Sequence, residues 1–214
     1  MKLYSGPLSL FTAKVRIALD EKHLSCELIS VPFSKAHGYT PKHPDVLALN
    51  PKGQVPVLVD GDVALYDSTL ILEYLEERYP EPPLYPRDIA GRVRCRQLEA
   101  AADEILFPVV WELIDEVFYG PDAGGRNVER IAGAKASISA HCERLDHALA
   151  GRDFLCGQFT VADIAYFLTL MFATSLGAPP EPTHRQLAAW STRMMARPSV
   201  GREVEGLTAA SQRV

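Results

Sequence analysis

Apolar positions in the first eighty residues follow two different periods. The segments KLYS (2–5) and CELISV (26–31) are predicted as strands, whereas apolar residues between them, in 10–23, recur at the spacing of a helix face. PVLV (56–59) and DVALYD (62–67) flank an Asp60-Gly61 step, which is a strong hairpin signal. The chain therefore begins with strand, helix and strand, and then continues through a loop-rich stretch with about one helical turn to a β-hairpin.

The segment DSTLILEYLEERYP (67–80) reads as a helix that stops before Pro80. Its apolar spacing predicts that Leu70, Ile71, Tyr74 and Leu75 point inward. A β-α-β unit followed by a hairpin and a helix predicts a small mixed sheet covered by helices.

Strand signals disappear after the proline-rich stretch YPEPPLYPRD (79–88). Residues 88–118 form a long helical pattern that Pro108 should kink, and the glycine-rich segment 121–125 separates it from a second long helix. We therefore expect three regions: a mixed domain at 1–80, a linker at 81–87 and an all-helical domain at 88–214.

The segment QFTVADIAYFLTLMF (158–172) is predicted as the buried core helix of the second domain. It is apolar nearly all round, and Thr160 occupies the N-cap position. Asp163 stands three residues later, where a capping box usually has Glu or Gln. LAAWSTRMMARP and a final amphipathic segment complete the helical half.

Composition excludes several classes of protein. The chain has 214 residues, 47% hydrophobic and 23% charged, and its net charge of -5 gives no basic footprint for nucleic acid. No secretory signal and no membrane-spanning run is evident, so a cytoplasmic protein is expected. No metal site is expected, because the histidines and the four cysteines lack metal-ligand spacing. The cysteines are expected to be reduced thiols: Cys26, Cys95, Cys142 and Cys156.

Pro56 stands at the start of the most strand-like segment, although proline cannot donate a ladder hydrogen bond. On base rates, a trans proline that starts an edge strand is the expected explanation. A cis Val55-Pro56 bond would instead leave the N–H and C=O of Val55 unpaired by the sheet. Those groups could then bind the backbone of another peptide as an added strand does.

Four stretches together resemble the cytosolic glutathione transferases, over essentially the whole chain. They are SGPLSLFTAKVRIAL (5–19), ALNPKGQVPVLVDGD (48–62), LYDSTLILEYL (65–75) and FTVADIAYF (159–167). The resemblance implies a thioredoxin-like N-terminal domain (βαβ-ββα, with a cis proline) followed by an all-helical C-terminal domain. It also implies glutathione as co-substrate and a small hydrophobic electrophile as second substrate, without a metal.

The resemblance assigns glutathione contacts to residues of the first domain. Val55, before a cis Pro56, would pair its backbone with the cysteinyl part, and Asp67 and Ser68 would bind the γ-glutamyl end. Taken alone, Asp67-Ser68 is better explained as a simple N-cap, since Asp and Ser are preferred at that position. Candidates for the glycyl carboxylate are Lys42, otherwise a solvated loop lysine, and Gln54. Gly53 departs from relatives that have a ligand-binding side chain at its position.

Three hydroxyls compete to stabilise the glutathione thiolate: those of Ser5, Ser9 and Thr12, with Tyr4 as a neighbour of Ser5. Ser9 matches the position of the catalytic hydroxyl in serine-type family members, so we select it. Cysteine-type relatives have Cys there, and zeta-type isomerases have a Ser-Ser-Cys run where this chain has Ser-Leu-Phe. From local sequence alone, Ser9 could simply cap the helix, and capping could conflict with donation because one hydroxyl proton points only one way.

The electrophile would lie in an apolar pocket between the first helix and the helix that contains Pro108. The candidate lining residues, each of which could also be ordinary core, are Phe11, Phe107, Trp111 and Tyr119. Family members are usually homodimers, and Asp103 matches an acidic residue that reaches the partner's glutathione, although a solvated aspartate is the alternative. A non-catalytic binding or regulatory protein, like the stringent-starvation-type proteins, is the competing interpretation of the whole chain.

Overall fold

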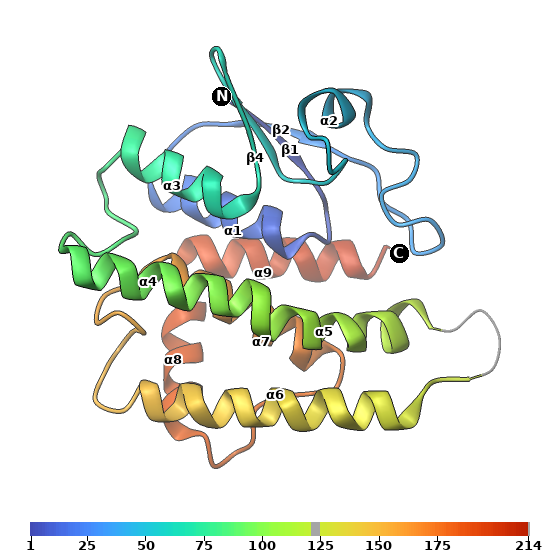
Figure 1. Cartoon of the computed structure of the whole chain (residues 1–214), viewed down its shortest axis with the longest axis vertical. Coiled ribbons are helices and arrows are strands. Elements are labelled where there is room, and N and C mark those ends of the chain that lie inside the picture. The colour runs from blue at the N-terminus through green and yellow to red at the C-terminus, as the bar shows by residue number, and fades with distance from the viewer. Residues whose placement is uncertain (121–124, 214) are drawn as a thin grey trace. The chain divides into compact units, whose positions relative to one another are not determined.

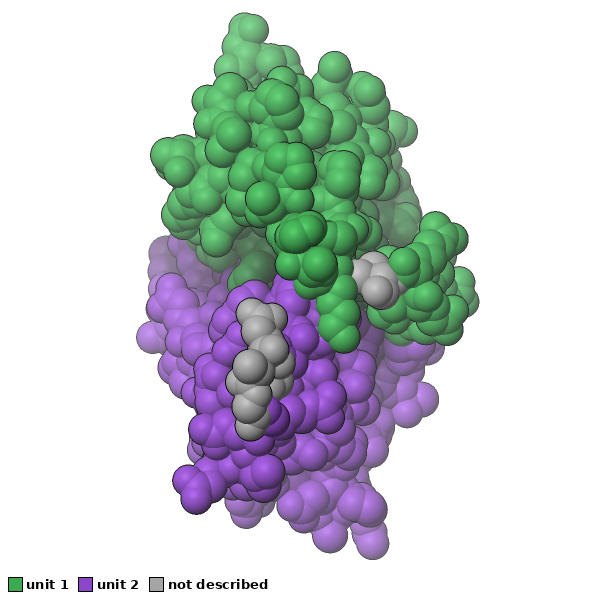
Figure 2. All heavy atoms as spheres, turned by 90° about the vertical axis from the view of Figure 1, so that its right-hand side faces the viewer, with its two compact units in different colours: residues 1–84, 197–214 green, residues 85–196 purple. Residues whose placement is uncertain are grey.

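The computed structural model describes residues 1–120 and 125–213, in two compact units. Residues 1–84 and 197–214 make up the first unit, and residues 85–196 make up the second; Figure 2 colours them separately. The first unit contains β1 (Lys2–Ser5), α1 (Leu10–Glu21), β2 (Glu27–Ser30), α2 (Pro44–Leu49), β3 (Val57–Asp60), β4 (Val63–Tyr66), α3 (Ser68–Arg78) and α9 (Pro198–Ser211). The expected break at 121–125 lies, except for Gly125, outside the described residues.

In its described part, the second unit contains helices and loops but no strand. Its elements are α4 (Ile89–Ala101), the π-helix η1 (Ala102–Leu106), α5 (Phe107–Leu113), the π-helix η2 (Ile114–Tyr119), α6 (Val128–Ala148), α7 (Val161–Ser175) and α8 (Arg185–Met195). The predicted fold class, a thioredoxin-like unit plus an all-helical one, is confirmed (Figure 1).

The four strands form one mixed sheet in the order β2-β1-β3-β4. β1 runs parallel to β2 and antiparallel to β3, and β3 is antiparallel to β4. Val57, the first residue of β3, lies opposite both Tyr4 and Tyr66, near the ends of β1 and β4. The chain therefore leaves β1, enters β3 and leaves β4 at the same end of the sheet. This end, where the strands begin or stop, is called the sheet edge below.

Helices pack on this sheet in the way that its alternating pattern predicts. On one face, Tyr4 and Val57 form a buried cluster with Val46 of α2. Figure 1 shows α1 and α3 running side by side below the strands, away from α2. Successive side chains of a strand point to opposite faces, so each strand contributes to both layers.

The inward face of α3 differs in one position from the prediction. Ile71 and Leu75 are fully buried as expected, but Leu70 is 54% exposed, and Leu72 is buried instead. Glu76, four residues after Leu72, also points inward. Positions one residue before the buried stripe project from the far side of a helix, which explains the exposure of Leu70.

A buried ion pair joins α1 to α3. The Lys22 Nζ lies 2.7 Å from a carboxylate oxygen of Glu76, and it also donates to the Tyr79 and Pro82 carbonyls. The same Glu76 oxygen accepts from the Leu84 N–H at 3.0 Å. Both charges thus have several partners, as buried charges require.

α9 packs against α1 through charged side chains, although it follows the second unit in the chain. The Nε of Arg16 donates to Glu203 at 2.9 Å, and the Nε of Arg197 donates to Glu21 at 3.0 Å. These bidentate contacts fix the last helix on the first one.

Pro108 interrupts the long helix predicted at 88–118 without ending it. The residues just before it, Ala102–Leu106, form a π-helix, and α5 then begins at Phe107. Proline has no N–H to donate to the residue four positions earlier, so a wider turn can take up the lost bond.

α7 has the predicted cap and the predicted burial. Thr160 and Asp163 form a capping box, and residues 161–170 are all buried. Asp163 also accepts from the Trp190 indole at 2.9 Å, so it anchors α8 as well as the start of α7. In the part of the chain that the structure describes, no helix has the length and apolar character needed to cross a membrane.

Candidate functional site

Three segments meet at the sheet edge where β1 and β4 end and β3 begins. They are the loop 6–9 that leads into α1, the turn 53–56 before β3, and Asp67-Ser68 after β4. The strand register therefore gathers most of the sequence-predicted glutathione residues at one place.

The Val55-Pro56 peptide bond is cis, as the second of the two alternatives predicted. β3 begins only at Val57, and the Val55 backbone hydrogen-bonds to no other described residue. Val55 therefore presents an N–H and a C=O to any extended peptide that lies along this edge.

Asp67 and Ser68 form the start of α3. Asp67 is the N-cap, and its side chain accepts from the Thr69 N–H at 3.2 Å. Ser68 is only 4% exposed, and no described residue accepts from its N–H. A helix N-terminus with an unpaired N–H favours an anionic group.

The backbone of Asp67 has an unusual conformation, with φ of 77°. Positive φ is uncommon for a residue with a side chain and is often found at functional sites. Lys52, which the sequence analysis did not select, places its Nζ 3.3 Å from the Asp67 carboxylate.

Lys42 and Gln54 are exposed, and Lys42 lies beside the turn before β3. A Cβ built on Gly53 would lie 3.9 Å from the Lys42 side chain, so the two residues are neighbours. The Gln54 carbonyl accepts from the Asn50 amide at 2.7 Å, which fixes the turn and leaves the Gln54 side chain in solvent.

Among the three competing hydroxyls, only that of Ser9 belongs to a residue that is not buried. Thr12 is fully buried and Ser5 is 7% exposed, whereas Ser9 is half-buried at the N-cap of α1. The Ser9 Oγ accepts from the Thr12 N–H at 3.2 Å. Because this cap uses the oxygen as acceptor, the hydroxyl proton is available for donation, and the expected conflict between the two roles does not arise.

The hydroxyls of Ser5 and of its neighbour Tyr4 already have partners. The Ser5 Oγ accepts from Arg16, and the Tyr4 hydroxyl donates to Asp45 at 2.7 Å. This hydrogen bond and burial raise the pKa of Tyr4, so the Tyr4 hydroxyl keeps its proton and donates it in the hydrogen bond to Asp45.

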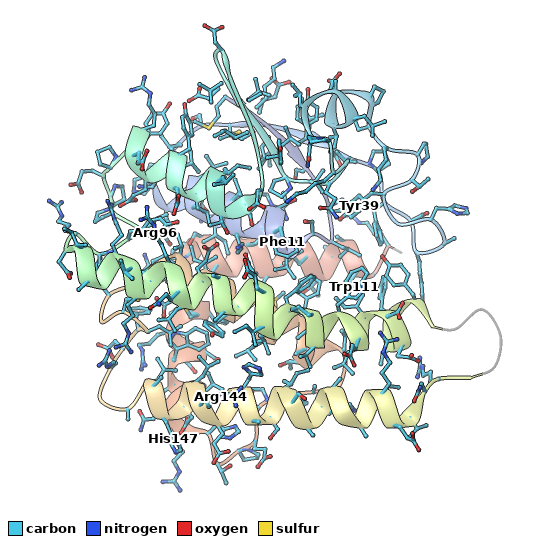
Figure 3. The ribbon with its side chains drawn as sticks, viewed as in Figure 1. Phe11, Tyr39, Arg96, Trp111, Arg144 and His147 are labelled. Carbon is cyan, nitrogen blue, oxygen red and sulfur yellow. The ribbon has the colours of Figure 1, made fainter. Side chains whose placement is uncertain are left out.

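Tyr39 is a further hydroxyl near the site that the sequence analysis missed. Its oxygen accepts from the Leu8 N–H at 3.3 Å, and a Cβ on Gly6 would lie only 2.6 Å from it (Figure 3). Gly6 is therefore required for the close approach of Tyr39 to the loop that presents Ser9. Nothing in the local sequence around Tyr39 indicates this contact.

Three of the four predicted pocket aromatics form a row in the second unit. The ring of Trp111 lies 6.1 Å from that of Phe107 and 6.2 Å from that of Tyr119, centroid to centroid. Trp111 is 46% exposed, which is high for such a large apolar side chain (Figure 3). Phe11 is half-buried on α1 of the first unit, and Asp103 lies in η1.

Within residues 1–120 and 125–213, no group of three or more His, Cys, Asp or Glu side chains is arranged to hold a metal ion.

Comparisons with known proteins identify a family that combines these two units, a thioredoxin-like unit with a cis proline and a helical unit. The chain matches the family models for the glutathione S-transferase N-terminal domain at residues 3–83 and C-terminal domain at residues 117–198. It is 32% identical to glutathione S-transferase 3 of Zea mays over 97% of this chain and 94% of that protein. This chain belongs to the glutathione S-transferase family.

Two further similarities show the range of the family. A crystal structure of a glutathione S-transferase from Rhodospirillum rubrum superposes with a TM-score of 0.83 at 31% identity, covering 94% of this chain and 90% of that one. A stringent starvation protein A homolog from Coxiella burnetii is 43% identical over 100 residues, which is 46% of this chain and 44% of that protein. The match to the latter thus spans less than half of either chain.

Proposed function

We propose that this protein is a serine-type glutathione transferase that binds glutathione along the edge of its sheet and activates its thiol with Ser9. One edge presents the unpaired backbone of Val55, the unpaired N–H of Ser68 and the half-buried hydroxyl of Ser9, and this observation carries the proposal.

Glutathione would bind as a short added strand. The Val55 N–H and C=O pair with the cysteinyl residue, and the Ser68 N–H and hydroxyl bind the γ-glutamyl carboxylate at the start of α3. Asp67 would bind the γ-glutamyl ammonium, and Lys42 and Gln54 would bind the glycyl carboxylate. Lys52, whose Nζ lies 3.3 Å from the Asp67 carboxylate, would help to orient that carboxylate.

Ser9 would stabilise the thiolate by donating its hydroxyl proton to the sulfur. A free thiol of this kind has a pKa near ~8.5, so a shift of about two pKa units requires roughly 2.7 kcal/mol of differential stabilisation. One hydrogen bond to an anion contributes about 1.5–3 kcal/mol, and the start of α1 adds some tenths more. A single hydroxyl at this helix start is therefore sufficient.

The bound thiolate would attack an electrophilic carbon of a small hydrophobic substrate, forming a carbon–sulfur bond as the leaving group departs. Trp111 and its aromatic neighbours Phe107 and Tyr119 are the proposed contacts for that substrate in the second unit. We further propose a cytoplasmic homodimer in which Asp103 reaches the partner's glutathione.

One observation favours a second function. The chain is 43% identical to a stringent starvation protein A homolog over 100 residues. The alternative is therefore a non-catalytic binding protein on the same fold. The two functions differ in whether a thiolate forms and reacts.

Calorimetric titration with glutathione, combined with turnover of an activated aryl halide, tests the proposal. Ser68→Ala should weaken glutathione binding about tenfold, or ~1.4 kcal/mol, because the γ-glutamyl carboxylate loses one donor. Ser175→Ala is the matched control, since that serine is exposed at the end of α7 and belongs to the other unit. Tight binding without turnover would favour the non-catalytic function, and no glutathione binding at all would refute the transferase proposal.

A further inference from the structure

A series of hydrogen bonds within the first unit connects the last helix, α9, to the loop that presents Ser9. The Arg16 Nε of α1 donates to Glu203 of α9 at 2.9 Å. The same guanidinium donates through its Nη1 to the Ser5 Oγ and, at 3.4 Å, to the Gly6 carbonyl. That carbonyl also accepts from the Ser9 N–H at 3.3 Å. Glu203 is thus linked to the Ser9 backbone through one side chain and one carbonyl, although nearly the whole chain separates the two residues.

Arg16 reaches this loop because of its place on α1, which lies beside α9 (Figure 1). It stands two turns after the N-cap Ser9, or about 10 Å along the helix axis. Side chains of a helix lean toward its N-terminus, so a long arginine side chain can extend back to the residues that precede the helix. Its planar guanidinium has five N–H donors, so one side can bind a carboxylate while another N–H group binds the loop.

The two charges of this link are largely shielded from water. The Arg16 side chain is 17% exposed and that of Glu203 is 11% exposed. Water and salt screen a shielded pair less than a surface pair, and removing one partner leaves the other charge poorly hydrated. We therefore expect the guanidinium to keep its place on the loop only while Glu203 holds its other side.

The backbone of Gly6 is held at both of its polar groups. Its carbonyl accepts from Arg16, and its N–H donates to the Thr12 Oγ1 at 3.4 Å. The Thr12 N–H in turn donates to the Ser9 Oγ at 3.2 Å. The orientation of the Ser9 hydroxyl therefore depends on a loop that α1 fixes from inside and Arg16 fixes from the side of α9.

A second ion pair joins the same two helices without reaching the loop. The Arg202 Nε of α9 donates to Asp20 of α1 at 3.2 Å, and the two side chains are 62% and 39% exposed. In the described structure, the hydrogen bonds of these two side chains reach no residue of the loop 5–9. This pair can therefore separate the docking of α9 on α1 from the positioning of the loop.

We propose that Arg16 and Glu203 are positioning residues for Ser9. Glu203 holds Arg16, and Arg16 fixes the Gly6 carbonyl and thereby the direction in which Ser9 presents its hydroxyl. The inference rests on the proposed function, because its chemical consequence is the quality of the hydrogen bond from Ser9 to the glutathione sulfur. Neither positioning residue binds glutathione itself in this scheme.

A positioning role has a signature that a role in glutathione binding does not have. If the loop loosens, the Ser9 hydroxyl donates less well, and the pKa of the bound thiol rises toward that of the free thiol. The rest of glutathione is bound by groups outside this network, those of Val55 and Ser68, so its affinity should not change. The expected effect is therefore a shift of the thiolate pKa at constant affinity.

The test compares Glu203→Gln, which removes the charge at nearly constant shape, with the control Arg202→Gln in the full chain. In the ligand-free protein, the amides of Ser9 and Thr12 should exchange hydrogen at least about fivefold faster in Glu203→Gln than in wild type. With glutathione bound, the thiolate pKa should rise by about one unit in Glu203→Gln. The affinity for S-methylglutathione, which has no thiol, should stay at its wild-type value. Arg202→Gln should match wild type in all three measurements.

Arg16→Lys provides a second variant should Glu203→Gln fail to fold, and circular dichroism checks each protein. A single ammonium group cannot span the Glu203 carboxylate and the Gly6 carbonyl, so the same two changes are expected. Equal amide exchange and equal thiolate pKa in Glu203→Gln and Arg202→Gln would overturn the proposal. Faster exchange with an unchanged thiolate pKa would also overturn it, because the pair would then stabilise the loop without positioning Ser9.

The failure of this inference is distinguishable from the failure of the proposed function. A wild-type protein that binds glutathione without lowering the pKa of its thiol would refute the proposed function. Amide exchange in the ligand-free proteins needs no glutathione, so it would still decide whether Glu203 holds the loop before α1.

Discussion

At the scale of single residues, Ser9 has two tasks that use different atoms. Its oxygen accepts from the Thr12 N–H and caps α1, and its proton is available for a ligand sulfur. Substitutions can therefore separate capping from thiolate stabilisation, since a carboxylate side chain can do the first and not the second.

Ser9→Asp separates the two roles. Aspartate is as good an N-cap as serine, so the free energy of unfolding should stay within about 0.5 kcal/mol of wild type, whereas Ser9→Ala should lose about 1 kcal/mol. Both variants should lose the lowered pKa of bound glutathione, because aspartate repels a thiolate. Urea unfolding and a thiolate titration measure the two properties, and a lowered thiolate pKa retained in Ser9→Asp would contradict the assignment.

Cys156 should react with an alkylating reagent as a thiol whose pKa is about 7. Its rate of alkylation should rise with pH and level off above that value, since only the thiolate attacks. Around the sulfur, Cys95 and Arg94 favour the thiolate and Asp163 opposes it. At neutral pH the rate should exceed that of Cys26 by at least about tenfold. Peptide mapping of the alkylated protein measures both rates. Equal rates for Cys156 and Cys26 would contradict the lowered pKa of Cys156.

Only those parts of the candidate site that lie in recognisable sequence motifs could be predicted from the sequence. The segments around Ser9, Val55 and Ser68 each have local signatures of a helix start or a special strand entry, and the structure gathers them at one edge. The contact of Tyr39 with the Leu8 N–H depends on how a long loop folds back, and no local pattern records that.

At the scale of elements, the buried pair of Lys22 and Glu76 holds the first unit together. Glu76→Gln should lower the free energy of unfolding by about 3 kcal/mol or more, because it leaves the Lys22 charge buried without a counter-ion. The exposed pair of Lys2 and Glu27, 3.8 Å apart, is the matched control. Glu27→Gln should change stability by less than about 0.5 kcal/mol. Chemical unfolding of both variants measures the difference. Equal losses in the free energy of unfolding would show that the buried pair stabilises the protein no more than the exposed pair does.

Helices and strands were predictable where their periodicity is strong. The apolar stretch of α7 and the hairpin at Asp60-Gly61 are confirmed, because packing and turn chemistry agree there with the local pattern. The π-helices on either side of α5 were not predicted, since only the position of Pro108 indicated any irregularity. The exposure of Leu70 was also missed, because the consecutive apolar residues Leu70, Ile71 and Leu72 point to different sides of the helix and only tertiary packing selects which side is buried.

At the scale of the whole molecule, we expect a homodimer, since family members associate through the helices near the linker. Ile89 and Val93 of α4 are 84% and 48% exposed, which is unusual for two apolar neighbours on one helix face. Replacing both with Glu should convert the dimer to a monomer in sedimentation experiments, because burying two unpaired charges opposes association. Met195→Glu, on α8, is the control and should leave the dimer intact. A wild-type monomer, or a dimer that tolerates both α4 charges, would contradict this expectation.

The central claim is that this chain binds glutathione and lowers its thiol pKa through Ser9. Ultraviolet absorbance of the thiolate, followed against pH with glutathione bound, tests that claim most directly in wild type and Ser9→Ala. We predict a thiolate pKa about two units below ~8.5 in wild type and a value near that of the free thiol in Ser9→Ala. The same lowered pKa in both proteins, or glutathione bound only as the thiol, would contradict the account.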